Sequence, residues 1–92
     1  MKNGNLTEFM DKLYYGEELE FEYEGSRYFL QGWSYDCGSK MTLDAMDQQP
    51  FQKYIWECEG KSMRECAEAF ISAPIWEGNT FLQIESDITW ID

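Results

Sequence analysis

The amino-acid sequence predicts an α+β fold: an N-terminal helix, an antiparallel sheet of about four or five strands, and a second helix near residues 62–72. Apolar residues recur with a helical period in residues 5–15, alternate with charged residues from Glu18 to Glu24, and return to the helical period after Ser62. The length of 92 residues predicts one domain, 1–92, with one core. A content of 43% hydrophobic and 17% aromatic residues excludes a disordered chain.

The N-terminal helix is predicted over residues 5–15. Its apolar residues follow the spacing of one buried helix face: Leu6, Phe9, Met10, Leu13 and Tyr14. Asn5 is a suitable N-cap, and Gly16 is a typical terminator because glycine adopts the left-handed conformation at low cost.

The predicted strands, in chain order, are 18–24, 27–36, 40–46 and 53–58, with a closing strand at 87–91. Short turns at Gly25-Ser26 and at Cys37-Gly38-Ser39 favour antiparallel hairpins. The segment Asp47-Gln48-Gln49-Pro50 is the clearest break, and Gly60 is interpreted as a turn residue.

The second helix is predicted to begin at Ser62, which forms an S-x-x-E capping box with Glu65. Its inner face consists of Met63, Cys66, Ala67 and Phe70. Pro74 ends it, and Thr80 to Ile84 is interpreted as a further helical turn.

The net charge is −11, with 18 acidic residues against seven basic ones and no basic residue after Arg64. Such a chain repels nucleic acid and anionic membranes, so direct binding to either is disfavoured and a basic partner is favoured. The three cysteines are too few and too dispersed for a disulfide framework, and neither a signal peptide nor a long apolar segment is present. A cytoplasmic protein with reduced thiols is expected, in the cytoplasm of the host cell if a mobile element encodes it.

No catalytic residue, metal site or cofactor is predicted. The absence of histidine excludes Ser-His-Asp and Cys-His catalysis, and the chain has no C-x-x-C pair or phosphate-binding glycine loop. The one catalytic alternative is a small metal-dependent nuclease, because Asp44 and Asp47 followed by Glu59-Gly60-Lys61 resemble the PD-(D/E)-x-K pattern, whose carboxylates hold Mg²⁺. The lack of a basic track for a nucleic-acid substrate argues against it.

Alternation in the acidic strand places glutamates in a row on one face: Glu18, Glu20, Glu22 and Glu24, extended by Glu17. Alternate residues on a strand lie about 6.6 Å apart, and phosphates follow one another every ~3.4 Å of axis along a nucleic-acid strand. A straight file of carboxylates therefore fits a groove of Arg and Lys side chains that is built for phosphates. The alternative is a solvated face that is acidic for solubility and to discourage pairing at a sheet edge.

Aromatic side chains provide a second interface signal. Alternation in the second strand places Phe29, Trp33 and Tyr35 on one face. Either the sheet is covered on both sides, or an aromatic patch is exposed for a partner, where Tyr and Trp are common hot-spot residues. The residues predicted to bind the partner are Glu17, Glu18, Glu20, Glu22, Glu24, Trp33 and Tyr35.

A short internal echo links Tyr23-Glu24-Gly25-Ser26, Cys58-Glu59-Gly60-Lys61 and Trp76-Glu77-Gly78-Asn79. Glycine provides positive φ at low cost, so three turns with the same Glu-Gly chemistry are the simpler interpretation. A duplicated unit is the alternative.

The run from Glu20 to Tyr28, E-F-x-Y-x-G-x-[KR]-Y, resembles one found in small uncharacterised acidic bacterial proteins of phage and other mobile elements, and E-G-K-S-M-R-E, Glu59 to Glu65, is similar to a second pattern of theirs. The resemblance implies no catalytic residue. It implies a setting in which acidic inhibitors, anti-CRISPR proteins among them, are common. We therefore expect a non-enzymatic inhibitor that binds a basic nucleic-acid-binding protein, such as a CRISPR effector nuclease, by phosphate mimicry. An immunity protein that neutralises a cognate bacterial toxin is the alternative.

Overall fold

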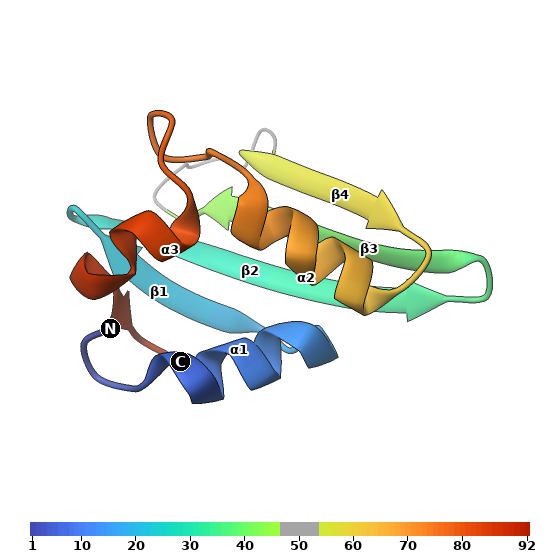
Figure 1. Cartoon of the computed structure of the whole chain (residues 1–92), viewed down its shortest axis with the longest axis horizontal. Helices are drawn as coiled ribbons and strands as arrows, with labels where there is room; N and C mark the ends of the chain where they lie inside the picture. The colour runs from blue at the N-terminus through green and yellow to red at the C-terminus, as the bar shows by residue number, and fades with distance from the viewer. Residues whose placement is uncertain (47–53) are drawn as a thin grey trace.

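A computed structural model of the chain describes residues 1–46 and 54–92. It confirms the predicted α+β fold, with the N-terminal helix, an antiparallel sheet and the second helix in the expected order (Figure 1). The elements are α1 (Leu6–Tyr15), β1 (Leu19–Tyr23), β2 (Ser26–Tyr35), β3 (Gly38–Ala45), β4 (Trp56–Gly60), α2 (Met63–Ser72), α3 (Phe81–Ile84), the 3₁₀ turn η1 (Glu85–Asp87) and β5 (Thr89–Trp90). None of the helices in these two ranges is long and apolar enough to span a membrane.

The five strands form one sheet in the order β4-β3-β2-β1-β5, and every neighbouring pair is antiparallel. A two-residue turn joins β1 to β2, with φ of 49° at Glu24 and 81° at Gly25. Positive φ at both central residues is typical of the type I′ turn, whose twist matches that of the flanking strands. The turn therefore lies at Glu24-Gly25, and Ser26 pairs with Tyr23 as the first residue of β2 instead of belonging to the turn.

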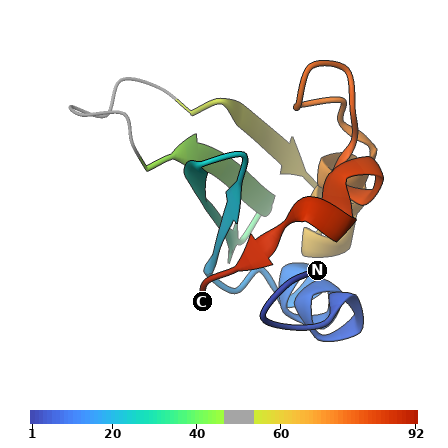
Figure 2. The ribbon, with the colours of Figure 1, turned by 90° about the vertical axis from the view of Figure 1, so that its left-hand side faces the viewer.

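All three helices lie on the same side of the sheet (Figure 2). The core fills the space between the helices and the sheet, and its largest fully buried side chains are the rings of Phe9, Phe21, Phe70 and Phe81. The Phe81 ring centroid lies 5.1 Å from that of Phe9 and 5.4 Å from that of Phe70, so the C-terminal segment is tied to both long helices.

The two long helices begin where their capping residues predict. Asn5 accepts a hydrogen bond from the Glu8 N–H at 2.8 Å, and Ser62 accepts one from the Glu65 N–H at 3.2 Å. Each cap satisfies one of the backbone donors that a helix leaves free at its first turn. Gly16 ends α1 with φ of 74°, as expected for a glycine C-cap.

The structure differs from the sequence predictions around β4 and at the C-terminus. Gly60 is the last residue of β4, in register with Ser39, so its interpretation as a turn residue is wrong. A Cβ atom at Gly60 would lie 3.1 Å from a carboxylate oxygen of Glu65, so the glycine allows α2 to approach the strand. The closing strand is shorter than predicted, because Glu85–Asp87 forms a 3₁₀ turn. The predicted break at Asp47–Pro50 and the predicted strand start at Lys53 lie outside the described residues.

Candidate functional site: the open face of the sheet

Among residues 1–46 and 54–92, no helix lies on one face of the sheet (Figure 2). Side chains alternate along each strand, and the register turns Leu19, Leu30 and Leu43 toward the helices. We call the opposite side the open face. It consists of Glu20 and Glu22 of β1, Arg27, Phe29, Gln31, Trp33 and Tyr35 of β2, Lys40, Thr42 and Asp44 of β3, and Glu57 and Glu59 of β4. Of the two arrangements that the sequence allows, helices cover the sheet on one side only.

The acidic row on β1 is partly compensated. Glu20 and Glu22 are half-buried, and a guanidinium nitrogen of Arg27 lies 3.5 Å from a carboxylate oxygen of Glu20. Arg27 is also the cross-strand neighbour of Glu22, so one cation offsets the repulsion between two glutamates. β1 lies between β2 and β5. The suggestion that this row protects a sheet edge is therefore wrong.

The other predicted glutamates lie outside β1. Glu17 lies 3.6 Å from the Lys12 ammonium, and Glu18 is exposed and lines a cavity near α1. Glu24 belongs to the β1–β2 turn and lines a cavity on the helix side of the sheet. The expectation that Glu24 continues the straight row is therefore wrong, because the chain turns directly after the five-residue strand.

The predicted aromatic residues lie at the far end of the same face. Trp33 is 38% exposed and Tyr35 is 46% exposed. They belong to the part of the β2–β3 hairpin that extends past β1, whose pairing with β2 ends at Leu19 and Leu30 (Figure 1). Trp33 is the cross-strand neighbour of Lys40, which in turn pairs with Glu59 of β4. The aromatic residues therefore lie nearer to the acids of β4 than to most of those of β1.

Glu57 and Glu59 are open-face residues that were not predicted from the sequence. Glu57 is exposed and lies 3.8 Å from the Lys40 ammonium, and Glu59 is exposed on the same side of β4. The alternation of Trp56 and Cys58 with these two glutamates is the signal that identifies them, since the same alternation was used for β1.

Two polar side chains on β3 have unsatisfied groups. The Oγ1 atom of Thr42 and the Oδ1 atom of Asp44 are buried without a hydrogen-bond partner among the described residues. Burial raises the pKa of the Asp44 carboxyl above its ordinary value, because the charged form loses hydration. A carboxylate in this position destabilises the free protein.

The alternative nuclease site is not assembled by the described residues. Glu59 faces the open side of the sheet opposite Lys40, and Asp47 lies outside the described ranges. Within residues 1–46 and 54–92, no group of three His, Cys, Asp or Glu side chains is arranged to hold a metal ion.

The three thiols are free, and they differ in burial. Cys66 is fully buried, and burial, followed by the neighbouring Cys58, raises the pKa of its thiol to about 11. This confirms the prediction of a buried thiol on the inner face of α2. Cys37, in the β2–β3 turn, is exposed.

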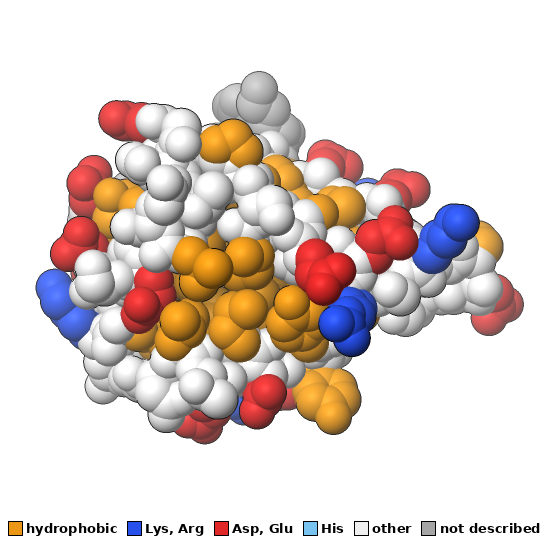
Figure 3. All heavy atoms as spheres, viewed as in Figure 1, with side chains coloured by type: hydrophobic (Ala, Val, Ile, Leu, Met, Phe, Trp, Pro, Cys, Tyr) orange, Lys and Arg blue, Asp and Glu red, His pale blue; other side chains and the backbone are white. Residues whose placement is uncertain are grey.

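The helix side also has exposed apolar surface. Hydrophobic side chains gather where α1, α2 and α3 meet, with acidic side chains around them (Figure 3). The exposed large apolar residues of these helices are Tyr14 and Tyr15 of α1 and Leu82 of α3. This helix-side patch is the natural comparison surface for any test of the open face.

Searches against protein-family models, curated proteins and solved structures found no match to this chain.

Proposed function

We propose that the protein is a non-enzymatic inhibitor that binds a basic nucleic-acid-binding protein, such as an RNA-guided nuclease, through the open face of its sheet. The carboxylates of that face occupy positions that phosphates would take in the groove of the partner. The exposed aromatic side chains at the end of the β2–β3 hairpin add apolar contact area.

The observation that carries the proposal is a helix-free sheet face on which acidic side chains outnumber basic ones. The acids are Glu20, Glu22, Asp44, Glu57 and Glu59, and the bases are Arg27 and Lys40. Both bases are ion-paired within the face at 3.5–3.8 Å. Five acids against two bases leave the face with three excess negative charges when all the acids are ionised.

The dimensions of the open face favour an extended partner surface. Arg27 and Tyr35 are eight residues apart on β2, which corresponds to about 27 Å of strand. The acids of β1 and β4 are separated by three strand spacings, about 14 Å. A groove that holds a nucleic-acid backbone is long and lined with cations on both walls, and an acidic face of this extent matches it better than it matches a small catalytic cleft.

The test uses purified protein against a panel of RNA-guided nucleases and nuclease toxins, with cleavage of labelled nucleic acid as the readout. The variant E20Q/E22Q/E59Q removes three charges from the open face. The control E8Q/D11N/E68Q removes three charges from exposed helix positions, so both carry the same net charge. We expect at least about a tenfold weaker inhibition, ~1.4 kcal/mol, for the open-face variant and less than about threefold for the control.

Equal loss in the two variants would show that only net charge matters, and no loss in either would refute the mechanism. Increasing salt is expected to weaken inhibition by the unmodified protein, because screening acts on exposed charges. Inhibition restricted to one toxin would replace the proposal with the immunity function.

The aromatic contribution is tested separately. We expect W33A/Y35A to weaken inhibition, whereas Y15A/L82A, which removes two exposed apolar side chains from the helix-side patch, leaves it unchanged. The reverse result would move the interface to the helices.

A further inference from the structure

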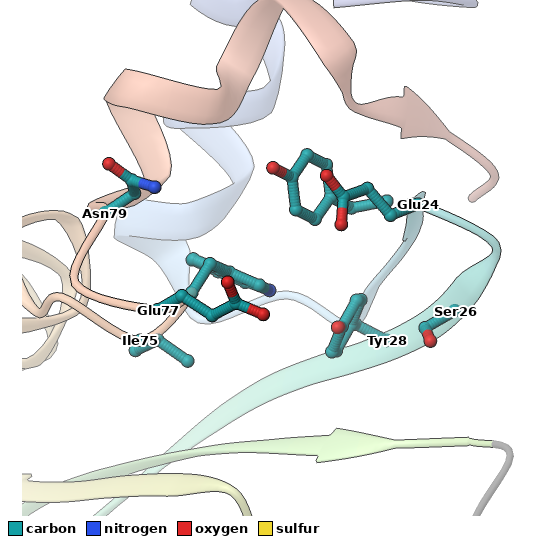
Figure 4. A pocket seen from close by; sticks show the side chains of 8 residues that line it. Glu24, Ser26, Tyr28, Ile75, Glu77 and Asn79 are labelled. Carbon is teal, nitrogen blue, oxygen red and sulfur yellow. The ribbon is translucent and has the colours of Figure 1, made fainter.

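A cavity of about 400 Å³ lies on the helix side of the sheet, between the β1–β2 turn and the turn that precedes α3 (Figure 4). Its walls include Tyr23, Tyr28 and Trp76, and the carboxylates of Glu24 and Glu77 lie on opposite sides of it. We call it the Glu24–Glu77 pocket. It shares no residue with the acids of the open face.

The two glutamates are presented by matching turns. Glu24 and Gly25 have φ of 49° and 81°, and Glu77 and Gly78 have φ of 53° and 88°. Trp76 and Asn79 exchange backbone hydrogen bonds of 3.1 and 2.9 Å across the second turn, as Tyr23 pairs with Ser26 across the first. Two members of the internal echo are therefore turns, as the simpler interpretation predicts, and they face one another across this pocket. The third member is part of β4.

Three aromatic rings line the pocket, and Trp76 packs edge-to-face against the other two. The Trp76 ring centroid lies 5.8 Å from that of Tyr28 and 6.5 Å from that of Tyr23, with interplanar angles of 86° and 75°. An aromatic lining favours an organic cation, because the face of a ring attracts positive charge.

The pocket has a negative field that no lining cation offsets. Its described lining residues include no Lys or Arg. Burial first, then the charge of Glu24 and a hydrogen bond to it, and also the charges of Asp87 and Glu77, raise the pKa of the Tyr23 hydroxyl.

The pocket wall also contains an unsatisfied donor. Trp76 is only 7% exposed, and its indole Nε1 has no hydrogen-bond acceptor among the described residues. A buried donor without a partner destabilises the free protein, and a ligand that brings a carbonyl oxygen beside its cation satisfies it.

We propose that the Glu24–Glu77 pocket binds an arginine side chain of a protein partner. The guanidinium group is planar and has five donors, which suit two carboxylates from opposite sides together with the side-chain oxygens of Ser26 and Asn79 in the lining. It stacks on aromatic rings and loses less hydration than the compact ammonium of lysine. A peptide carbonyl next to the arginine supplies the acceptor for the indole N–H.

This inference goes beyond the proposed function, because the pocket lies on the other side of the sheet and uses other residues. The test is an NMR titration of the isotope-labelled full chain with Nα-acetyl-arginine methylamide. The matched ligands are the citrulline compound, which has the same shape without the charge, the lysine compound, and free arginine.

We expect saturable shifts of the Trp76 indole signal and of the Glu24 and Glu77 amides, with a Kd of about 1 mM or tighter for the blocked arginine. The lysine compound is expected to bind at least about threefold more weakly, and the citrulline compound not to saturate. Free arginine is expected to bind more weakly than the blocked form, because it has no acetyl carbonyl and because its charged α-ammonium and α-carboxylate lose hydration beside the aromatic wall.

The variant E24Q/E77Q is expected to weaken binding of the blocked arginine at least about tenfold, and D11N/E68Q, which removes the same charge from exposed helix positions, to leave it unchanged. Unchanged binding by E24Q/E77Q, or equal binding of citrulline, would overturn the site. Equal or tighter binding of the lysine compound would refute the preference for a guanidinium group. Tighter binding of free arginine would refute the inference that the bound arginine belongs to a protein partner. No saturable shift up to about 20 mM ligand would overturn the proposal as a whole. The nuclease panel is unaffected by any of these outcomes, so the two proposals fail separately.

Discussion

Replacing Phe81 with alanine is expected to remove a large fraction of the stability of the fold. Phe81 is fully buried although α3 is only four residues long. Its ring contacts those of Phe9, Phe21 and Phe70 at centroid distances of 5.1–5.6 Å and that of Trp76 at 6.0 Å. So short a helix has no stability of its own, and this side chain therefore holds the C-terminal segment against the sheet.

The magnitude follows from the burial. Removing a buried Phe side chain costs about 3–5 kcal/mol through lost transfer free energy and the remaining cavity. A chain of 92 residues has a free energy of unfolding of about 5–14 kcal/mol at the usual value per residue. We expect Phe81→Ala to lower Tm by at least about 12 °C, since 1 kcal/mol corresponds to about 4–8 °C in a domain of this size.

The assay is urea and thermal unfolding followed by circular dichroism. Leu82→Ala is the matched control, because Leu82 follows Phe81 in the same helix and is 48% exposed. It is expected to cost less than about 1 kcal/mol. Phe81→Leu keeps part of the apolar volume and is expected to fall between the two, which preserves the comparison if the alanine variant does not fold. Equal costs for Phe81→Ala and Leu82→Ala would refute the assignment of Phe81 to the core.

Three further predictions concern single positions. Cys37 is expected to react with a thiol reagent in the native state. Cys66, which is buried and whose pKa is raised to about 11, is expected to react only after unfolding. Quantitative labelling with and without urea measures this difference. Asp44→Asn is expected to raise Tm at pH 7 and to change it little at pH 3. The folded-state pKa of Asp44 is raised, so stability is lost as pH rises from the ordinary pKa through the raised one, and asparagine does not titrate. The same increase in Tm at pH 3 and at pH 7 would contradict this prediction for Asp44. Gly25→Ala is expected to destabilise the fold by about 1 kcal/mol, because φ at this position is 81°. A steric clash is not the cause, since a Cβ atom there meets nothing within 4 Å. Gly25→Asn is expected to destabilise the fold by less, and chemical denaturation of both variants measures the difference.

Local signals in the sequence were sufficient for most of the fold. The caps at Asn5 and Ser62 and the period of the apolar residues predicted both long helices to within a residue, because these interactions join residues three or four positions apart. Gly60 was misassigned for the opposite reason. The sequence shows a glycine, and only the packing of α2 against β4 explains why it lies in a strand.

The candidate sites were harder to predict from the sequence than the fold, because they depend on contacts between distant parts of the chain. Strand alternation predicted that Trp33 and Tyr35 share a face with Phe29, but nothing local indicates which face the helices cover. Glu24 was assigned to the acidic row because it continues the alternation. It does not belong to the row, because it is a central residue of the turn that follows β1. The partner turn at Glu77 is distant in sequence, so the pocket between the two turns becomes visible only when β5 and α3 are placed against β1.

The electrostatics of the free protein and of its proposed complexes act in opposite directions. The protein carries a net charge of −11, and the side-chain ion pairs among the described residues, at 3.4–3.8 Å, offset little of the repulsion between its acids. Self-repulsion among the acids destabilises the compact state. A basic partner relieves this repulsion when it binds, so part of the binding free energy is stabilisation of the fold. Salt therefore stabilises the free protein and weakens the complex, and a fold that depends on its few ion pairs would respond to salt in the reverse way.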